Sequence, residues 1–122
     1  MVVVREREVE SYLRRRVEEL GGECVKFIPD DMPGYPDRIV MLPGGVLAWA
    51  ETKKPKGGRV SKLQKFRHEQ LRKLGQDVFV VWTKEEADAL VGMLEHRMEA
   101  ERKQEEAILS AMRLWEQGAA RE

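Results

Sequence analysis

The chain has 122 residues, of which 36% are charged and 42% hydrophobic, and it carries no net charge at pH 7. This length predicts a single domain, and the composition is typical of a soluble globular protein. No apolar run approaches the ~20 residues that a membrane-spanning helix needs. The single cysteine, Cys24, excludes an internal disulfide and fits a reducing, cytoplasmic compartment.

The charges are unevenly distributed along the chain. Residues 1–32 carry 6 basic and 8 acidic groups, residues 33–75 carry 10 and 3, and residues 76–122 carry 6 and 11. The middle third therefore has a charge of +7 and the final part −5. A basic middle indicates a polyanionic partner, although a basic helix that pairs with an acidic one, within the fold or across a dimer, explains the same pattern.

The first half of the chain predicts a helix followed by three strands. An apolar stripe at helical spacing runs from Val9 to Leu20, and the pair Gly21-Gly22 ends the helix. The sequence Pro43-Gly44-Gly45 predicts the turn of a hairpin. The expected strands are ECVKFI (23–28), DRIVML (37–42) and VLAWAETK (46–53).

The second half predicts a helix, a strand and a further helical region. Four apolar residues of the helix 61–75 are expected to face the core, namely Leu63, Phe66, Leu71 and Leu74. The segment DVFVVW (77–82) has the composition of a strand covered on both faces, and the helix before it predicts parallel pairing with an earlier strand. Thr83 and Glu86 predict a capping box for a third helix that ends at Leu94.

The order of these elements predicts an α/β domain around a small mixed sheet over residues 1–95. Residues 96–122 form a predicted helical extension with a sparse apolar stripe. Docking on the domain, pairing with a second subunit and fraying are all open for this extension.

Charged residues stand at the ends of the two hairpin strands. A three-residue turn pairs Leu42 with Val46, which sets Asp37 opposite Glu51 on the same side of the sheet. Lys53 lies two residues beyond Glu51 and shares that side. Two carboxylates held so close repel each other and attract a proton or a cation.

These residue types together fit a site that cleaves phosphodiesters with a metal ion. Mg²⁺ or Mn²⁺ prefers oxygen ligands, and the backbone carbonyl of Thr52 offers one more beside Asp37 and Glu51. Lys53 beside a metal is placed to orient a water or to offset charge on phosphorus. Spacing alone leaves a second explanation, a strand-end salt bridge between Lys53 and one carboxylate.

The stretch GYPD, followed after 13 residues by ETK, resembles the PD-(D/E)XK nuclease signature. More narrowly, the chain is similar to the VRR-NUC domain family from about residue 4 to 95. Further family positions are matched by Gly34, by Ser61 with Gln64, and by Glu10 on the first helix. The family order αβββαβ agrees with the elements expected above.

The resemblance implies a restriction-endonuclease-like fold and an Mg²⁺- or Mn²⁺-dependent endonuclease that acts on DNA. Asp37 and Glu51 would be metal ligands, and Lys53 would assist the attacking water. Glu10 would be an outer or second-metal carboxylate, and Gln64 would line the site. Stand-alone family members occur in phages and bacteria and look like junction-resolving enzymes. They imply a homodimer acting on branched DNA, such as a Holliday junction, in the host cytoplasm.

Several supporting residues have a plainer explanation as well. Glu10 lies among helical charges that are routinely exposed, and Gln64 also completes a capping box with Ser61. His68 and His96 lack a companion at metal-ligand spacing. Trp49 and Trp82 are expected in the core rather than stacked on bases.

Five basic side chains border the predicted site and are expected to hold phosphates, namely Lys54, Lys56, Arg59, Lys62 and Lys65. A merely solvated basic surface is the alternative. Two other functions stay open for the whole chain. One is a non-catalytic DNA-binding module with the nuclease fold, and the other is an adaptor whose basic middle pairs with its own acidic tail.

Overall fold

The computed structural model describes residues 3–120. Its elements are α1 (Glu6–Glu19), β1 (Glu23–Lys26), β2 (Arg38–Leu42), β3 (Val46–Thr52), α2 (Lys62–Lys73), β4 (Val78–Val81) and α3 (Lys84–Ala120). This order confirms the predicted α/β class and the αβββαβ core. The strands are up to two residues shorter at an end than the sequence suggested.

The four strands form one mixed sheet in the order β1-β2-β3-β4. The first three strands pair antiparallel, and β4 pairs parallel with β3, as the crossover through α2 predicts. Leu42 pairs with Val46, so the three-residue turn is confirmed. Gly44 and Gly45 adopt φ values of 87° and 79°, which residues with a Cβ rarely tolerate.

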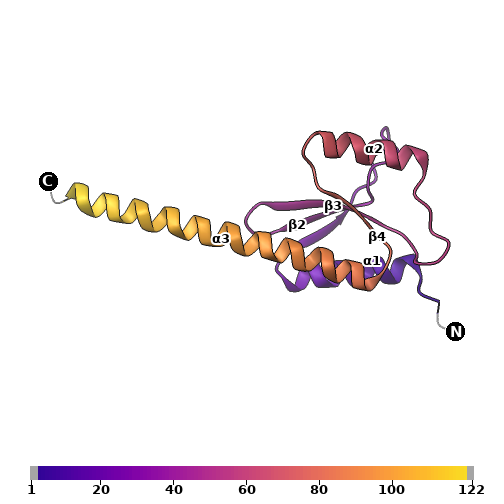
Figure 1. The fold of residues 1–122 in the computed structure, drawn as a ribbon, viewed down its shortest axis with the longest axis horizontal. Coiled ribbons are helices and arrows are strands. Elements are labelled where there is room, and N and C mark those ends of the chain that lie inside the picture. Colours follow the sequence, from indigo (N-terminus) through magenta and orange to yellow (C-terminus); the bar gives the residue numbers. More distant parts are fainter. Residues whose placement is uncertain (1–2, 121–122) are drawn as a thin grey trace.

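The main core lies between the sheet and two helices. Val9, Leu13 and Val17 of α1 are fully buried, and they pack in one cluster with the inward side chains of β2, β3 and α3. In Figure 1, α1 and α3 lie along one side of the sheet and α2 lies across it on the other side. The predicted apolar stripe of the first helix is therefore confirmed as its buried face.

Helix α2 does not bury the residues that its sequence suggested. Leu63, Phe66 and Leu74 are exposed, Leu74 to 77%, so their predicted place in the core is wrong. The helix buries Leu71 and, unexpectedly, His68. The reason is geometric. Helix α2 covers only one end of the sheet (Figure 1), and the exposure of Leu63, Phe66 and Leu74 shows that most of its apolar side chains face outward.

Helix α3 is a single continuous helix of 37 residues, which corrects the predicted end at Leu94. One of the two hydrogen bonds of the predicted capping box is present, because the Glu86 N–H donates to Thr83 Oγ1 at 3.0 Å. The Glu86 carboxylate, however, accepts from the Trp82 N–H. Every side chain described from 100 to 118 is exposed, and Figure 1 shows this part of α3 projecting from the domain as a rod.

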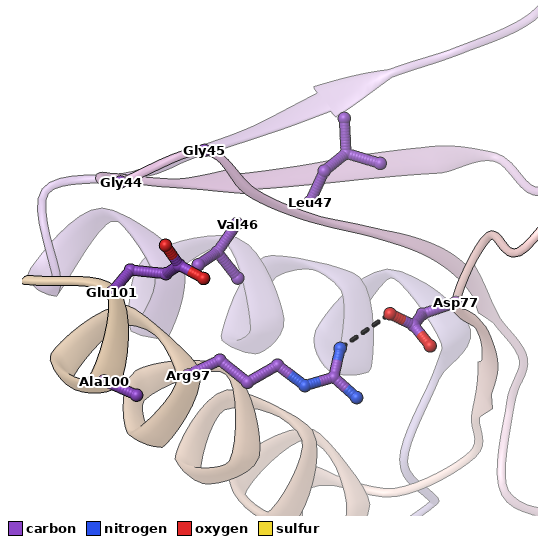
Figure 2. A pocket seen from close by; sticks show the side chains of 8 residues that line it. All are labelled: Gly44, Gly45, Val46, Leu47, Asp77, Arg97, Ala100 and Glu101. Atoms are coloured by element: carbon purple, nitrogen blue, oxygen red, sulfur yellow. Dashed lines mark hydrogen bonds and ion pairs between the residues drawn. The ribbon is translucent and has the colours of Figure 1, made fainter. Parts of the chain in front are cut away.

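The rod leaves the domain beside the hairpin turn. There Arg97 Nη1 donates to Asp77 Oδ2 at 2.6 Å, at the edge of a hollow of about 440 Å³. Figure 2 shows Arg97 reaching from α3 to Asp77, with Glu101 one turn further on near Gly44. This ion pair ties the direction of α3 to the segment just before β4. No helix within residues 3–120 is long and apolar enough to cross a membrane.

The two tryptophans are less buried than expected. Trp49 is half-buried on the outer face of β3, with its ring centroid 5.3 Å from that of Phe27, and its Nε1–H donates to Gln76. Trp82 lies just after β4 and is also half-buried. Their predicted burial in the core is therefore wrong, and both side chains lie at the edge of the core.

Candidate metal centre

Asp37 and Glu51 lie at the adjoining ends of β2 and β3. The register that pairs Arg38 with Ala50 sets Asp37 opposite Glu51 when it is continued by one residue. Glu51 is only 3% exposed. Its burial, followed by the negative charge of Asp37, raises the pKa of Glu51 from 4.5 to about 7, and Lys53 acts in the opposite direction. Asp37 therefore lies close enough to act electrostatically on Glu51, as expected from the predicted hairpin register.

The Asp37 carboxylate is held in place by Thr52. Its Oδ1 accepts from the Thr52 backbone N–H and its Oδ2 accepts from Thr52 Oγ1, both at 3.2 Å. Burial raises the pKa of Asp37, and these two bonds only partly offset that effect. Asp37 is thus fixed in orientation while its carboxylate keeps unused lone pairs.

Pro36 leaves the carbonyl oxygen of Thr52 without a strand partner. Trp49 donates its N–H to Asp77 O just before β4, and Lys53 donates to Val81 O on β4, so the alternate residues Ala50 and Thr52 direct their backbone groups toward β2. The register sets Thr52 opposite Pro36, and proline has no N–H to donate. The β2–β3 ladder therefore ends here, because the Thr52 carbonyl oxygen cannot accept a hydrogen bond from Pro36.

The two oxygens of Glu51 have different neighbours. Oε2 lies 3.9 Å from Lys53 Nζ, and Oε1 lies 3.7 Å from Nε2 of His68. Within residues 3–120, Oε1 and Nε2 have no hydrogen-bond partner although both are buried. Burial lowers the pKa of His68, and the positive charges of Arg72 and Lys53 lower it further.

His68 is a site neighbour that reading the sequence did not identify. The available signal was its spacing, because His68 lies one helical turn after Gln64 and so on the same face of α2. Gln64 itself forms the complete capping box with Ser61, in which its Oε1 accepts from the Ser61 N–H at 2.8 Å. The plainer explanation of Gln64 is therefore correct, and it leaves the amide nitrogen of Gln64 uncommitted.

Two glutamates of the first helix are candidates for the outer carboxylate, the expected Glu10 and also Glu6. Glu10 forms an ion pair with Arg38, whose guanidinium also donates to Cys24 O at 3.0 Å. Glu6, one turn earlier on α1, is the residue whose charge raises the pKa of both Asp37 and Glu51. The spacing of four residues puts Glu6 and Glu10 on one face of the helix, which was a signal for considering both.

Gly34 allows the loop before Asp37 to pack closely on α2. A Cβ at this position would lie 2.8 Å from Leu63 Cγ, and its φ of 92° disfavours any other residue. Arg67 secures the same contact by donating from Nε to Pro33 O at 3.1 Å. Helix α2 and the strand end that carries Asp37 are therefore joined on both sides of Gly34.

Five basic side chains follow Lys53 along the chain, in the loop before α2 and in its first turn, and we call them the basic rim. It consists of Lys54, Lys56, Arg59, Lys62 and Lys65, all of which are exposed. None of these five forms an ion pair with a carboxylate in the part of the chain that the structure describes. The first turn of α2 also has no acidic residue. The alternative that the acidic tail neutralises this rim within the subunit is thus not seen.

The residues present fit a hard divalent cation with few protein ligands. No three His, Cys, Asp or Glu side chains between residues 3 and 120 are grouped so as to hold a metal ion. Mg²⁺, however, commonly uses one or two carboxylates and keeps several waters. A buried carboxylate such as Glu51, close enough to Asp37 for the Asp37 charge to raise its pKa, is the arrangement that such a cation would neutralise.

Comparison with known proteins finds similar chains, although no family model matches. Over 81 residues the chain is 36% identical to the "Putative nuclease p44" of Acyrthosiphon pisum secondary endosymbiont phage 1. This alignment covers 66% of the chain and 86% of the phage protein. A solved structure described as a VRR_NUC domain superposes with a TM-score of 0.67 and 37% identity, and covers 71% of this chain and 94% of that one.

Proposed function

The chain belongs to the VRR-NUC family, and on this premise we propose that it is a divalent-metal-dependent endonuclease that hydrolyses phosphodiester bonds in branched DNA. The observation that carries the proposal is the pair of Asp37 and Glu51 at the ends of adjacent strands, in which burial and then the negative charge of Asp37 raise the pKa of Glu51. Such a pair is unfavourable unless a proton or a cation is present.

Three oxygen donors would hold the ion: the carboxylates of Asp37 and Glu51 and the backbone carbonyl of Thr52. When bound, Mg²⁺ or Mn²⁺ supplies Lewis acidity, which lowers the pKa of a coordinated water and stabilises charge on a phosphate. The chain's own part is to hold the ligands rigid. The two bonds from Thr52 to Asp37 and the burial of Glu51 support this role.

Lys53 is the group that we assign to the attacking water. Its side chain is mostly buried, and its Nζ lies 3.9 Å from Glu51 Oε2, too far for a tight ion pair. It is therefore free to donate to a water or to an oxygen on phosphorus. The amide nitrogen of Gln64 would line the site beside it, and Glu6 would supply the outer carboxylate that the resemblance implied for Glu10.

The basic rim would hold the DNA backbone. Its five side chains are exposed, lack carboxylate partners and lie in the loop after Lys53 and the first turn of α2. Contacts to phosphates do not depend on sequence. Recognition of a branched shape therefore fits better than recognition of a base sequence.

A homodimer would supply the two cuts that a junction needs. One site in a chain of 14.1 kDa cuts one strand, and a two-fold axis places a second site beside the first. The exposed apolar residues of the projecting part of α3 offer a surface for such pairing.

The direct test combines metal binding with cleavage. Purified protein is titrated with Mn²⁺ by calorimetry and incubated with labelled linear, flap, fork and four-way DNAs, with and without Mg²⁺.

We expect Asp37→Asn and Glu51→Gln each to abolish cleavage and to weaken Mn²⁺ binding, because each removes an anionic ligand. DNA binding should persist or tighten. Glu95→Gln, which changes an exposed carboxylate on α3, is the matched control. Retained DNA binding without Mn²⁺ binding or cleavage by the wild type would instead identify a non-catalytic DNA-binding module.

Lys53→Ala separates the chemistry from metal binding. We expect Mn²⁺ affinity to survive and cleavage to fall by about two orders of magnitude or more, the usual effect of one positioned acid–base or electrostatic group. Cleavage at the wild-type rate, with both carboxylate variants inactive, would reduce Lys53 to a strand-end cation.

A further inference from the structure

A buried histidine faces the buried glutamate of the site. His68 is 2% exposed and Glu51 is 3% exposed, so both side chains are removed from water. The Nε2 atom of His68 lies 3.7 Å from Glu51 Oε1. Each of these atoms lacks a hydrogen-bond partner within the described residues. Leaving a buried donor or acceptor unpaired costs about 1–3 kcal/mol, so this pair of vacancies calls for an explanation.

The two unpaired atoms are a potential donor and a potential acceptor, and they lie just beyond hydrogen-bonding distance of each other. A neutral imidazole that carries its proton on Nε2 is a donor, and a carboxylate oxygen is an acceptor. An N–H···O hydrogen bond spans about 2.7–3.2 Å, so a small rotation of either side chain would form the bond. Lys53 lies on the side of the other oxygen, Oε2. The two oxygens of Glu51 thus have separate surroundings.

We propose that His68 is a positioning residue for Glu51. When the metal ion occupies the site, Nε2–H of His68 donates to Glu51 Oε1 and directs Oε2 toward the ion and Lys53. This inference rests on the proposed function and adds to it the residue that fixes the carboxylate ligand. Hydrogen bonds from outside the ligand set commonly orient metal ligands in this way.

The helix that carries His68 is fixed to the loop before β2 and to β4, and these two strands flank β3. Arg67 donates to Pro33 O at 3.1 Å, just before the strand end with Asp37. Arg72 Nη2 donates to Val78 O at 2.9 Å on β4. His68 lies between these two anchors and is therefore held at a set height above Glu51. Gln64, the preceding polar residue on this face, already uses its carbonyl oxygen in the helix cap.

Two substitutions at position 68 separate positioning from packing. His68→Gln keeps an amide N–H at about the reach of Nε2, whereas His68→Leu keeps apolar bulk without a donor. We expect His68→Leu to lose about 10- to 100-fold in Mn²⁺ affinity, the usual effect of removing such a partner, and His68→Gln to retain most of it. Calorimetric titration with Mn²⁺ measures the affinity, and thermal unfolding of the same samples measures stability. His96→Leu, at the other, exposed histidine, is the control that should match the wild type.

Two results would overturn the inference while the proposed function stands. The first is a His68→Leu protein that binds Mn²⁺ and cuts DNA like the wild type. The second is an equal loss of Mn²⁺ affinity and of thermal stability in both variants, which would mean that His68 only packs. A wild type that neither binds Mn²⁺ nor cuts DNA would overturn the proposed function and this inference together.

A measurement on the wild type keeps the inference testable if His68→Leu does not fold. Nitrogen-15 NMR of the histidine side chains identifies which ring nitrogen carries the proton. We expect the proton to be on Nε2 of His68. The resonance of this proton should move downfield when Mg²⁺ is added. A proton on Nδ1, or a resonance that ignores Mg²⁺, would contradict the proposed hydrogen bond.

Discussion

Glu51 is costly to the fold at neutral pH when no cation is present. Its pKa of about 7 in the folded protein, against 4.5 ordinarily, means that the folded chain keeps a proton that the unfolded chain releases. The folded state therefore binds more protons between these two pH values, and stability falls as the pH rises through that window. Above it the full penalty applies, on the order of 3 kcal/mol.

Glu51→Gln should remove this penalty. In the presence of a chelator we expect the variant to be more stable than the wild type at about pH 8 and close to it near pH 4, since protonated Glu51 is already neutral there. Urea unfolding at the two pH values measures the difference. A stability gain that is independent of pH would mean that the ionised form of Glu51 is not the source of the penalty.

The two glutamates of α1 should behave differently when each is neutralised. Glu6→Gln removes a negative charge that acts on Asp37 and Glu51, so the pKa of Glu51 should fall. Because Glu6 is the proposed outer carboxylate, cleavage should weaken, with little change in stability. Glu10→Gln leaves the mostly buried Arg38 without its carboxylate, so it should mainly destabilise the fold. Thermal unfolding and cleavage assays on both variants decide the assignment, and a reversed pattern would return the site role to Glu10.

At the scale of elements, the hairpin could be predicted and the contacts of α2 could not. The turn glycines and the period of two fix the register locally, so Asp37, Glu51 and Lys53 could be placed on one side of the sheet from sequence. The burial of His68 depends on where α2 meets the sheet, which no local pattern encodes. Its apolar stripe even predicted the wrong buried set, because most of that surface faces outward.

Helix α3 illustrates a different limit of sequence reading. The predicted end at Leu94 followed from the point where the apolar stripe becomes sparse. The residues beyond it are rich in glutamate, alanine and arginine, which favour a helix without any packing partner. Local preference therefore continues the helix where the core no longer supports it.

The basic loop between β3 and α2 should contribute to DNA affinity without sequence preference. Replacing Lys56 and Arg59 by alanine should weaken binding equally for all sequences and lower the salt slope by roughly one unit for each lost phosphate contact. Binding isotherms at several salt concentrations measure the slope. The control replaces Lys103 and Arg113, two exposed basic residues on the projecting part of α3. An unchanged slope in the loop variant would mean that the loop points away from the DNA.

At the scale of the whole molecule, the projecting part of α3 is the surface through which we propose that two chains associate. Ile108, Met112 and Trp115 recur at helical spacing and share one face, and Trp115 is 75% exposed. Burying such a side chain contributes about 1.5–3 kcal/mol, so burial of these residues between two chains would favour a dimer over the monomer. Pairing of two such faces would link the domains without covering either basic rim.

Replacing these three residues by glutamine should therefore convert a dimer into a monomer. Light scattering of the wild type should give a mass near twice 14.1 kDa, and the triple variant should give half of that. Thermal unfolding of the domain should change little at low concentration, because these side chains make no contact with its core. The matched control places glutamine at Glu106, Ser110 and Arg113, which lie on the opposite face and leave the net charge unchanged.

On four-way DNA, the monomeric variant should nick single strands but lose paired incision, since the second cut needs a second site on the same junction. A wild type that is a stable monomer at assay concentration and still makes paired cuts would show that α3 does not serve this purpose.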